Sequence, residues 1–137
     1  MAVFVMTNAY VLINSQDHSN HVKEVTLEYN AELQDDTVMG DTTRSRIPGL
    51  LDWKLTVEYL QDFADNDVDE DLFGLVGAAA FAVAVRPVNT TISAANPEYQ
   101  GNAVLESYSP VKGAIGELAG FTAVFMASSA LVRDITP

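Results

Sequence analysis

Two stretches of strict alternation between apolar and polar residues constrain this chain more than any other feature. Residues 21–33 and residues 53–63 each place large apolar side chains on one parity and polar side chains on the other. Successive side chains of a β-strand point to opposite faces of a sheet, so a period of two predicts two half-buried strands. Residues 34–51 between them are largely polar, include Pro48 and Gly49, and predict a long connecting loop of the kind that usually serves a function.

The alternation also predicts which residues share a face when these two strands pair as a hairpin. The buried face should combine two apolar sets, Val25, Leu27, Tyr29, Ala31 and Leu33 with Trp53, Leu55, Val57, Tyr59 and Phe63. The opposite face should carry a row of acids with one base, namely Glu24, Glu28, Glu32, Asp52, Glu58 and Asp62 with Lys54. One side of the hairpin is therefore expected to be negatively charged and in contact with water.

The rest of the chain predicts four further strands and one helix. Strands are expected at residues 9–13, 78–85, 102–111 and 117–127, with turn-rich segments at residues 14–20 and 88–101. A helix is expected at residues 67–77, because Asp67 and Glu70 have the spacing of a capping box and Gly77 suits a C-terminal stop. Residues 128–137 show no clear period, and residues 1–137 are expected to form a single β-rich domain.

The charge balance of the chain is strongly acidic, with 19 Asp and Glu, 7 Lys and Arg, and a net charge of −12. Clustered basic residues are needed to hold a phosphate backbone, so this charge balance argues against a protein that wraps nucleic acid. An acidic surface suits a protein that lets DNA pass without sticking, but charge alone favours the simpler interpretation of a soluble protein that must only stay dispersed. A hydrophobic content of 48% excludes general disorder.

The chain has no cysteine, so disulfide scaffolds and thiolate metal sites are excluded. Its apolar start, residues 1–13, carries no basic region and is too short to span a bilayer, which favours a strand over a signal peptide. The protein is therefore expected to act without export and without a membrane.

A calcium loop is suggested by three acids and then excluded by their neighbours. Asp65, Asp67 and Asp69 match the opening of such a loop, but Glu70 and Val76 stand where it requires Gly and Glu. The N-terminus of the expected helix explains these acids better, because its dipole favours negative charge.

No enzyme motif is complete in this sequence. The two histidines, His18 and His21, lie in or beside a turn and are expected at the surface. Neither a G-x-S-x-G nucleophile elbow nor a Gly-rich phosphate loop is present. We therefore predict no enzyme activity, no cofactor and no metal.

Arg44 and Arg46 allow three interpretations. They could contact phosphate, but two bases in a chain with 19 acids make a poor DNA site. They could belong to a solvated loop. The favoured interpretation is that they pair with carboxylates of another copy, because an Arg fork meets a carboxylate through two hydrogen bonds.

An ordered set of short runs carries a family resemblance. Within the expected loop and after it stand Asp35-Asp36-Thr37, then MGDTTRSRIPGL at residues 39–50, then Asp52-Trp53. Later runs are Gln61-Asp62-Phe63, Val85-Arg86-Pro87 with Asn96-Pro97, and LESYSP at residues 105–110 with Gly113. This set, from about Ala9 to Phe125, resembles the tail tube (major tail) proteins of long, non-contractile-tailed bacteriophages.

The resemblance implies a mainly β fold of two packed sheets, a sandwich or barrel, with one flanking α-helix. Such subunits form hexameric rings that stack into a tube, and DNA passes through its lumen without specific binding. The loop would contact the adjoining ring through Asp35, Asp36, Met39, Asp41, Arg44, Arg46 and Ile47. The lumen would be lined by Glu24, Glu28, Glu32, Glu58 and Asp62. Pairing of edge strands around a closed ring would also remove exposed sheet edges.

The implied partners are copies of the chain itself and the tape-measure, tail terminator and distal tail proteins. The implied location is the virion tail, assembled in the host cytoplasm. Some relatives append an immunoglobulin-like domain, and this chain is expected to supply tube without such decoration. Two alternatives remain open: another phage structural protein, either a tail terminator or a capsid decoration protein, and a monomeric β-sandwich that binds carbohydrate or peptide.

Overall fold

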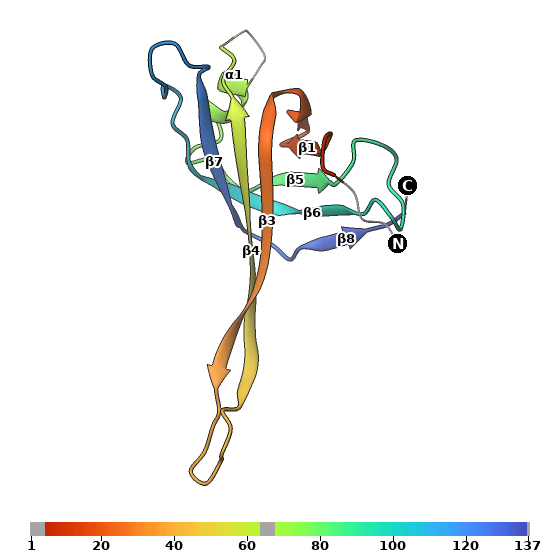
Figure 1. Cartoon of the computed structure of the whole chain (residues 1–137), viewed down its shortest axis with the longest axis vertical. Coiled ribbons are helices and arrows are strands. Elements are labelled where there is room, and N and C mark those ends of the chain that lie inside the picture. Colours follow the sequence, from red (N-terminus) through yellow and green to blue (C-terminus); the bar gives the residue numbers. More distant parts are fainter. Residues whose placement is uncertain (1–4, 64–67, 137) are drawn as a thin grey trace.

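Antiparallel strands make up most of the regular structure in the computed structural model, which describes residues 5–63 and 68–136 (Figure 1). The strands are β1 Tyr10–Ile13, β2 Gln16–Asp17, β3 Val22–Asp35, β4 Arg46–Leu60, β5 Phe81–Arg86, β6 Glu98–Ser107, β7 Gly120–Ala127 and β8 Val132–Asp134. The helices are a 3₁₀ turn, η1 Ser19–His21, and α1 Val68–Phe73. Among the described residues the strands form one sheet in the order β2-β1-β5-β6-β7-β4-β3, and β8 pairs with β6.

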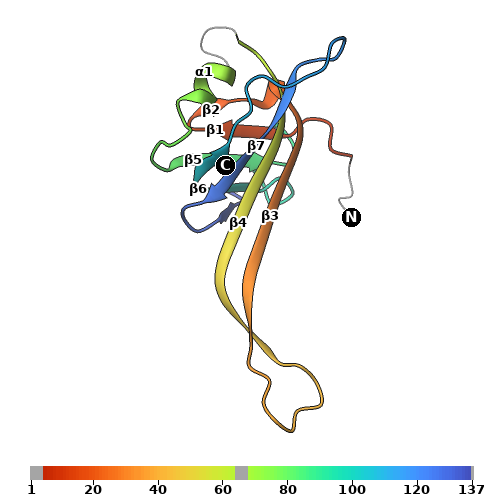
Figure 2. The same cartoon turned by 90° about the vertical axis from the view of Figure 1, so that its left-hand side faces the viewer.

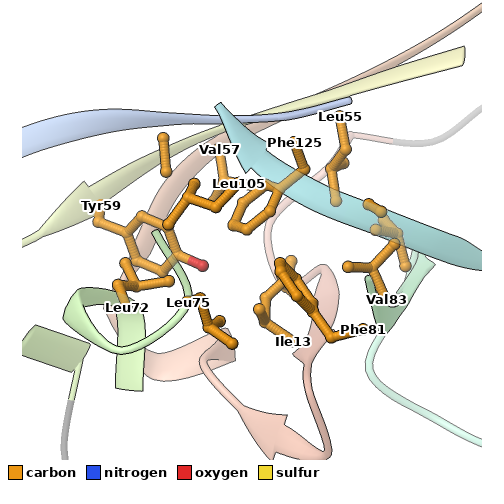
Figure 3. Close-up of a cluster of buried hydrophobic side chains, with 14 of the residues drawn as sticks. Ile13, Leu55, Val57, Tyr59, Leu72, Leu75, Phe81, Val83, Leu105 and Phe125 are labelled. Atoms are coloured by element: carbon orange, nitrogen blue, oxygen red, sulfur yellow. The ribbon is translucent and has the colours of Figure 1, made fainter. Parts of the chain in front are cut away.

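The sheet bends so that its two parts face each other across one core. Strands β3, β4 and β7 run along the long axis of the molecule, while β5, β6 and β8 cross it (Figure 1). Side chains from both parts, among them Ile13, Val57, Phe81 and Phe125, meet in the core, and Leu72 of α1 covers one end of it (Figure 3). The expected mainly β fold with one helix is therefore confirmed. The two separate sheets are not observed, because hydrogen bonds connect all described strands and the sheet is not closed.

The predicted pairing of the two alternating strands is confirmed. Leu27 lies opposite Leu55, and Tyr29 lies opposite Trp53. Strand β4 is flanked by β3 and β7, so its inward side chains are fully buried, whereas β3 is the sheet edge and leaves Tyr29 largely exposed. Phe63 does not join this face, because β4 ends at Leu60 and the Phe63 side chain is exposed.

The long loop expected at residues 34–51 is mostly strand. β3 continues to Asp35 and β4 begins at Arg46, so the connection is only residues 36–45. Pro48 is tolerated because β7 pairs only with Lys54–Leu60, which leaves this part of β4 without a second neighbour. The register shifts beside Leu33, and a Cβ at Gly49 would lie 3.1 Å from the Glu32 carbonyl oxygen. Pro and Gly, which usually signal a loop, here mark a β-bulge.

The helix is shorter than the expected residues 67–77. α1 ends at Phe73, and a turn follows in which the Leu75 amide donates to the Leu72 carbonyl over 3.0 Å. Gly77 adopts a φ of +79°, so it closes this turn instead of the helix itself. The expected cap Asp67, like Asp65, lies outside the described residues.

The other expected strands are present with shifted ends. The segments predicted at residues 9–13, 78–85, 102–111 and 117–127 correspond to β1, β5, β6 and β7. β6 begins four residues earlier than expected, at Glu98, within the predicted loop. Residues 128–137, for which no structure was expected, contain β8, whose three residues pair with the start of β6.

Candidate assembly surfaces

A two-stranded arm projects from the body of the molecule. Beyond the region where β7 pairs with β4, strands β3 and β4 continue alone as a twisted ribbon (Figures 1 and 2). We call residues 30–52 the arm and residues 36–45 at its end the tip. Its exposed large apolar side chains are Leu33, Val38, Met39, Ile47, Leu50 and Leu51. An isolated two-stranded ribbon cannot bury such side chains, so this surface is suited to a partner.

Hydrogen bonds across the base of the tip hold its two sides together. The Asp36 amide donates to the Ser45 carbonyl over 3.0 Å, and the Ser45 amide donates to the Thr37 hydroxyl over 2.7 Å. The Arg44 guanidinium donates to the Asp35 carboxylate over 2.6 Å. Hydrogen bonds from the Thr37 side chain and amide lower the pKa of Asp35, which keeps the partner of Arg44 ionised.

The outermost turn of the tip is also fixed by local bonds. The Val38 amide donates to the Asp41 carboxylate over 3.0 Å, and the Asp41 amide donates to the Val38 carbonyl over 3.1 Å. Gly40 supplies the positive φ, +100°, that the turn requires. The turn therefore presents Met39, whose side chain is fully exposed, as an apolar projection.

All residues expected to contact an adjoining ring lie on this arm and are exposed. They are Asp35, Asp36, Met39, Asp41, Arg44, Arg46 and Ile47. The structure adds that Arg44 already pairs with Asp35 of its own chain. Arg46 lies opposite Asp35 in the β3–β4 register.

The acidic face of the hairpin exists but is partly neutralised. Glu24 lies opposite Glu58, whereas Glu28 lies opposite Lys54. A register shift between Val22 and Glu24 makes Lys23 a bulged residue, and its Nζ lies 3.8 Å from a Glu58 carboxylate oxygen. Strict alternation predicts Lys23 on the opposite face, because the sequence pattern does not reveal the bulge.

Glu32 and Asp62, the other two acids expected to line the lumen, lie in different parts of the structure. Glu32 lies on the same strand further along the arm, where it accepts a hydrogen bond from Gln34 over 2.8 Å. Asp62 lies beyond the end of β4, and its carboxylate is 3.0 Å from His21 Nε2. The structure therefore brings Glu24, Glu28, Glu32 and Glu58 onto one face and separates Asp62 from them.

The expectation that His18 is at the surface is wrong. Its side chain is buried, with 2% exposed, between β4 and α1. Nε2 lies 2.9 Å from an Asp71 carboxylate oxygen, and Nδ1 lies 3.0 Å from the Tyr59 hydroxyl oxygen, so both ring nitrogens have hydrogen-bond partners. Burial, with a smaller contribution from Asp71, raises the pKa of Tyr59. No substrate can reach this buried row, so we interpret it as a clamp between η1, β4 and α1. Its partners lie 41 and 53 residues away, so no local pattern could reveal it.

A second exposed apolar surface, which sequence reasoning missed, lies in the β6–β7 loop, residues 108–119. Its exposed large side chains are Val111, Ile115 and Leu118. Figures 1 and 2 show this loop, in blue, at the end of the molecule opposite the tip. Most of this loop falls within the strands predicted at residues 102–111 and 117–127.

No three His, Asp or Glu side chains of the described residues are grouped to hold a metal ion. No helix of residues 5–63 or 68–136 has the length and apolar character needed to cross a bilayer.

Comparison with solved structures finds chains of similar fold in a virion, in the tail of a particle and in an injection system. A chain of the native gene transfer agent (GTA) virion superposes with a TM-score of 0.71 at 15% identity, over 95% of this chain and 96% of that one. A chain of the PVC extracellular contractile injection system, in the sheath/tube terminator structure in its extended state, gives 0.72 at 12% identity over 96% of both chains. A chain in the tail of the empty GTA particle, refined with C6 symmetry, gives 0.70 at 14% identity over 95% of both chains. The protein shares the fold of these chains. No protein-family model and no curated protein matches the sequence.

Proposed function

We propose that this protein is a structural, non-enzymatic subunit of a phage-like tail and that its copies stack into a tube through which DNA passes. The observation that carries the proposal is the arm, an ordered ribbon whose apolar side chains have no cover within the chain. Chains of tail particles share the fold, which supports another copy as the partner that covers the arm.

A ring of copies would also resolve the exposed edge of the sheet. β3 is an edge strand of 14 residues, and an edge of this length invites pairing with another chain. Lateral association around a closed ring removes such edges, and the six-fold symmetry of the similar GTA tail supports six copies per ring. The arm residues from Asp35 to Ile47 would then meet the adjoining ring.

The acidic face would line the bore in this arrangement. Glu24, Glu28, Glu32 and Glu58 would repel the phosphates of passing DNA, and Lys23 and Lys54 would limit that repulsion. Tape-measure, terminator and distal tail proteins would complete the tail of the virion.

Electron microscopy of the purified full-length chain tests this function. Hollow tubes, or rings with a central hole, are expected as the protein concentration rises. The proposal would be refuted if the protein stays monomeric by light scattering at every concentration and microscopy shows no rings or tubes. That result would favour a monomeric ligand-binding β domain.

A tail or tube terminator is the second candidate function. It is favoured by the likeness to a chain in the sheath/tube terminator structure. A terminator is expected to form single rings that do not stack, so rings of one layer at all concentrations would select it over a tube subunit.

A further inference from the structure

We propose that residues 1–5, which we call the strap, dock into an apolar groove on the inner face of β3 of their own chain. The groove has a volume of about 410 Å³. Val25, Leu27 and Tyr29 of β3 line one side of it, and Val85, Arg86 and Tyr99 of β5 and β6 line the other. The inference does not depend on the proposed function, because it concerns the single chain.

The groove exists because β3 is the edge of the bent sheet. Strand β4 has a neighbour on both sides, whereas β3 has only β4 beside it. Leu27 is therefore only partly buried and Tyr29 is 55% exposed, although both belong to the apolar face of the hairpin. An occupant that covers these side chains would stabilise the fold, because apolar surface would leave water.

The one charged side chain among the residues that line the groove already has partners. Arg86 Nε lies 3.4 Å from a Glu98 carboxylate oxygen, and the guanidinium lies over the Tyr10 ring, 4.1 Å from its centroid. Arg86 Nη1 also donates to the Thr90 carbonyl over 2.9 Å. Because this charge is compensated within the chain, an apolar occupant suits the groove better than an anionic ligand.

The path of the chain leads to the groove. A smaller hollow beside it is lined by residues 6–9 and by the start of β3, from Val22 to Val25. The segment is fixed there, because the Asn89 amide donates to the Asn8 carbonyl over 2.8 Å. Met6 and Val25 line both the hollow and the groove. The segment therefore runs along β3 toward the groove as the residue numbers fall, and the strap comes next.

The spacing of the apolar residues matches on the two segments. Side chains of an extended segment alternate, so Phe4 and Ala2 would share the face of Met6. On β3, Leu27 and Tyr29 follow the residue beside Met6 in the same steps of two. Phe4 would then lie beside Leu27. The small Ala2 would lie beside the bulky Tyr29, so large and small side chains would alternate along the contact.

The strap is a better occupant of the groove than a second copy. Residues 1–4 lie outside the described residues, and Val5, 82% exposed, is not seated in the groove. The sequence from residue 1 to residue 6, MAVFVM, is apolar throughout. From Val25 to Tyr29 the strand advances about 13 Å, at about 3.3 Å per residue, and five extended residues can follow it. A segment tethered beside its site has an effective concentration of about millimolar, which a separate chain must exceed to displace it.

The absence of cysteine makes an intrachain disulfide a direct test. Phe4→Cys combined with Leu27→Cys should lose both free thiols on mild oxidation of the dilute full-length protein and stay monomeric on a non-reducing gel. The extent should not change on dilution, because both thiols belong to one chain. The matched control combines Phe4→Cys with Thr26→Cys, the exposed neighbour on the opposite face of β3, and should keep both thiols.

The remaining outcomes would overturn the docking. A disulfide that joins two chains and decreases on dilution would assign the groove to a second copy. Free thiols in both variants, or an equal loss of thiols in both, would show that residue 4 has no preference for the groove. None of these results decides the proposed function, which is tested by tubes and rings of the unmodified chain.

Proton NMR of the unassembled full-length chain provides a second test with a milder substitution. An aromatic ring packed on a methyl group shifts the methyl proton resonance, so Phe4→Leu should move the Leu27 methyl signals. The methyl signals of Leu118, exposed in the β6–β7 loop, serve as the control and should stay in place. Unchanged Leu27 signals would overturn the docking of the strap.

Discussion

The two halves of β4 carry similar apolar residues in opposite surroundings. Leu55 and Val57 in the body are fully buried, whereas Leu50 and Leu51 in the arm are 78% and 63% exposed. The body half is covered by α1 and by the facing part of the bent sheet, while the arm half has only β3 beside it. The same hydrophobic driving force thus serves folding at one end of the strand and is left for association at the other.

The largest expected effect tests the body half. Trp53→Ala should lower the free energy of unfolding by about 3–5 kcal/mol, because a buried indole is lost. The substitution also removes the bond from Trp53 Nε1 to the Ser129 carbonyl, 2.7 Å long. Chemical denaturation of the unassembled protein measures the change, and a loss below about 1 kcal/mol would contradict the placement of Trp53 in the core.

The next effect concerns the joint between the body and the β6–β7 loop. Burial, and then the bond to Asp69, raise the pKa of Tyr108 from 10.0 to about 12. A raised pKa favours the protonated phenol in the folded state, so this stabilisation is complete below pH 10 and is lost as pH rises toward 12.

Tyr108→Phe should reduce stability at neutral pH by about 1 kcal/mol and flatten the decline between pH 10 and 12. Unfolding curves across this range measure both, with Tyr29→Phe, an exposed tyrosine of the arm base, as the matched control. If the loss of stability between pH 10 and 12 is the same in Tyr108→Phe, ionisation of Tyr108 does not contribute to it.

A smaller effect on folding is expected in the arm half of β4. Leu50→Ser with Leu51→Ser should change the unfolding free energy of the single chain by less than about 0.5 kcal/mol, because these side chains are exposed. The same variant should fail to form tubes. Tube formation at the normal concentration would break the comparison by showing that the arm needs no apolar partner.

The smallest effect concerns the tip. Thr37→Val removes a hydrogen bond that lowers the pKa of Asp35, so the Asp35 pKa should rise toward its ordinary value. Because folding lowers the pKa of Asp35, its carboxylate stabilises the folded tip at pH values above the ordinary carboxyl pKa. This stabilisation is lost as the pH falls through the lowered pKa. NMR titration of the Asp35 carboxyl checks the direction of the shift, and no upward change would contradict the role given to Thr37.

Sequence reasoning succeeded where one local pattern decided the outcome. Strict alternation around Leu27 and Leu55 predicted two paired strands that share an apolar face, and the pairing is observed. The face is buried on the body half of β4 but not on the edge strand β3, where Tyr29 and Leu33 are exposed. Sequence reasoning failed at Pro48 and Gly49, whose turn preference was overridden by a bulge in a ribbon with open edges. It also failed at β8, which is too short to show a period and exists through its pairing with β6.

The candidate surfaces divide in the same way. The arm residues lie along one continuous segment, so a sequence pattern could indicate them. The site around His18 joins residues from separated segments, because Tyr59 and Asp71 lie 41 and 53 residues away from it. Such sites arise from the bending of the sheet, which a linear pattern does not contain.

Because β4 runs without a break from the tip into the core, tension applied to the arm would act along the strand. Within the body, β4 is hydrogen-bonded to β3 on one side and to β7 on the other, from Lys54 to Leu60. Ladder bonds of an antiparallel pair lie perpendicular to the strands, so such a pull would load them together in shear instead of peeling them one by one. Tension on an arm anchored in this way would therefore enter the body through many ladder bonds at once.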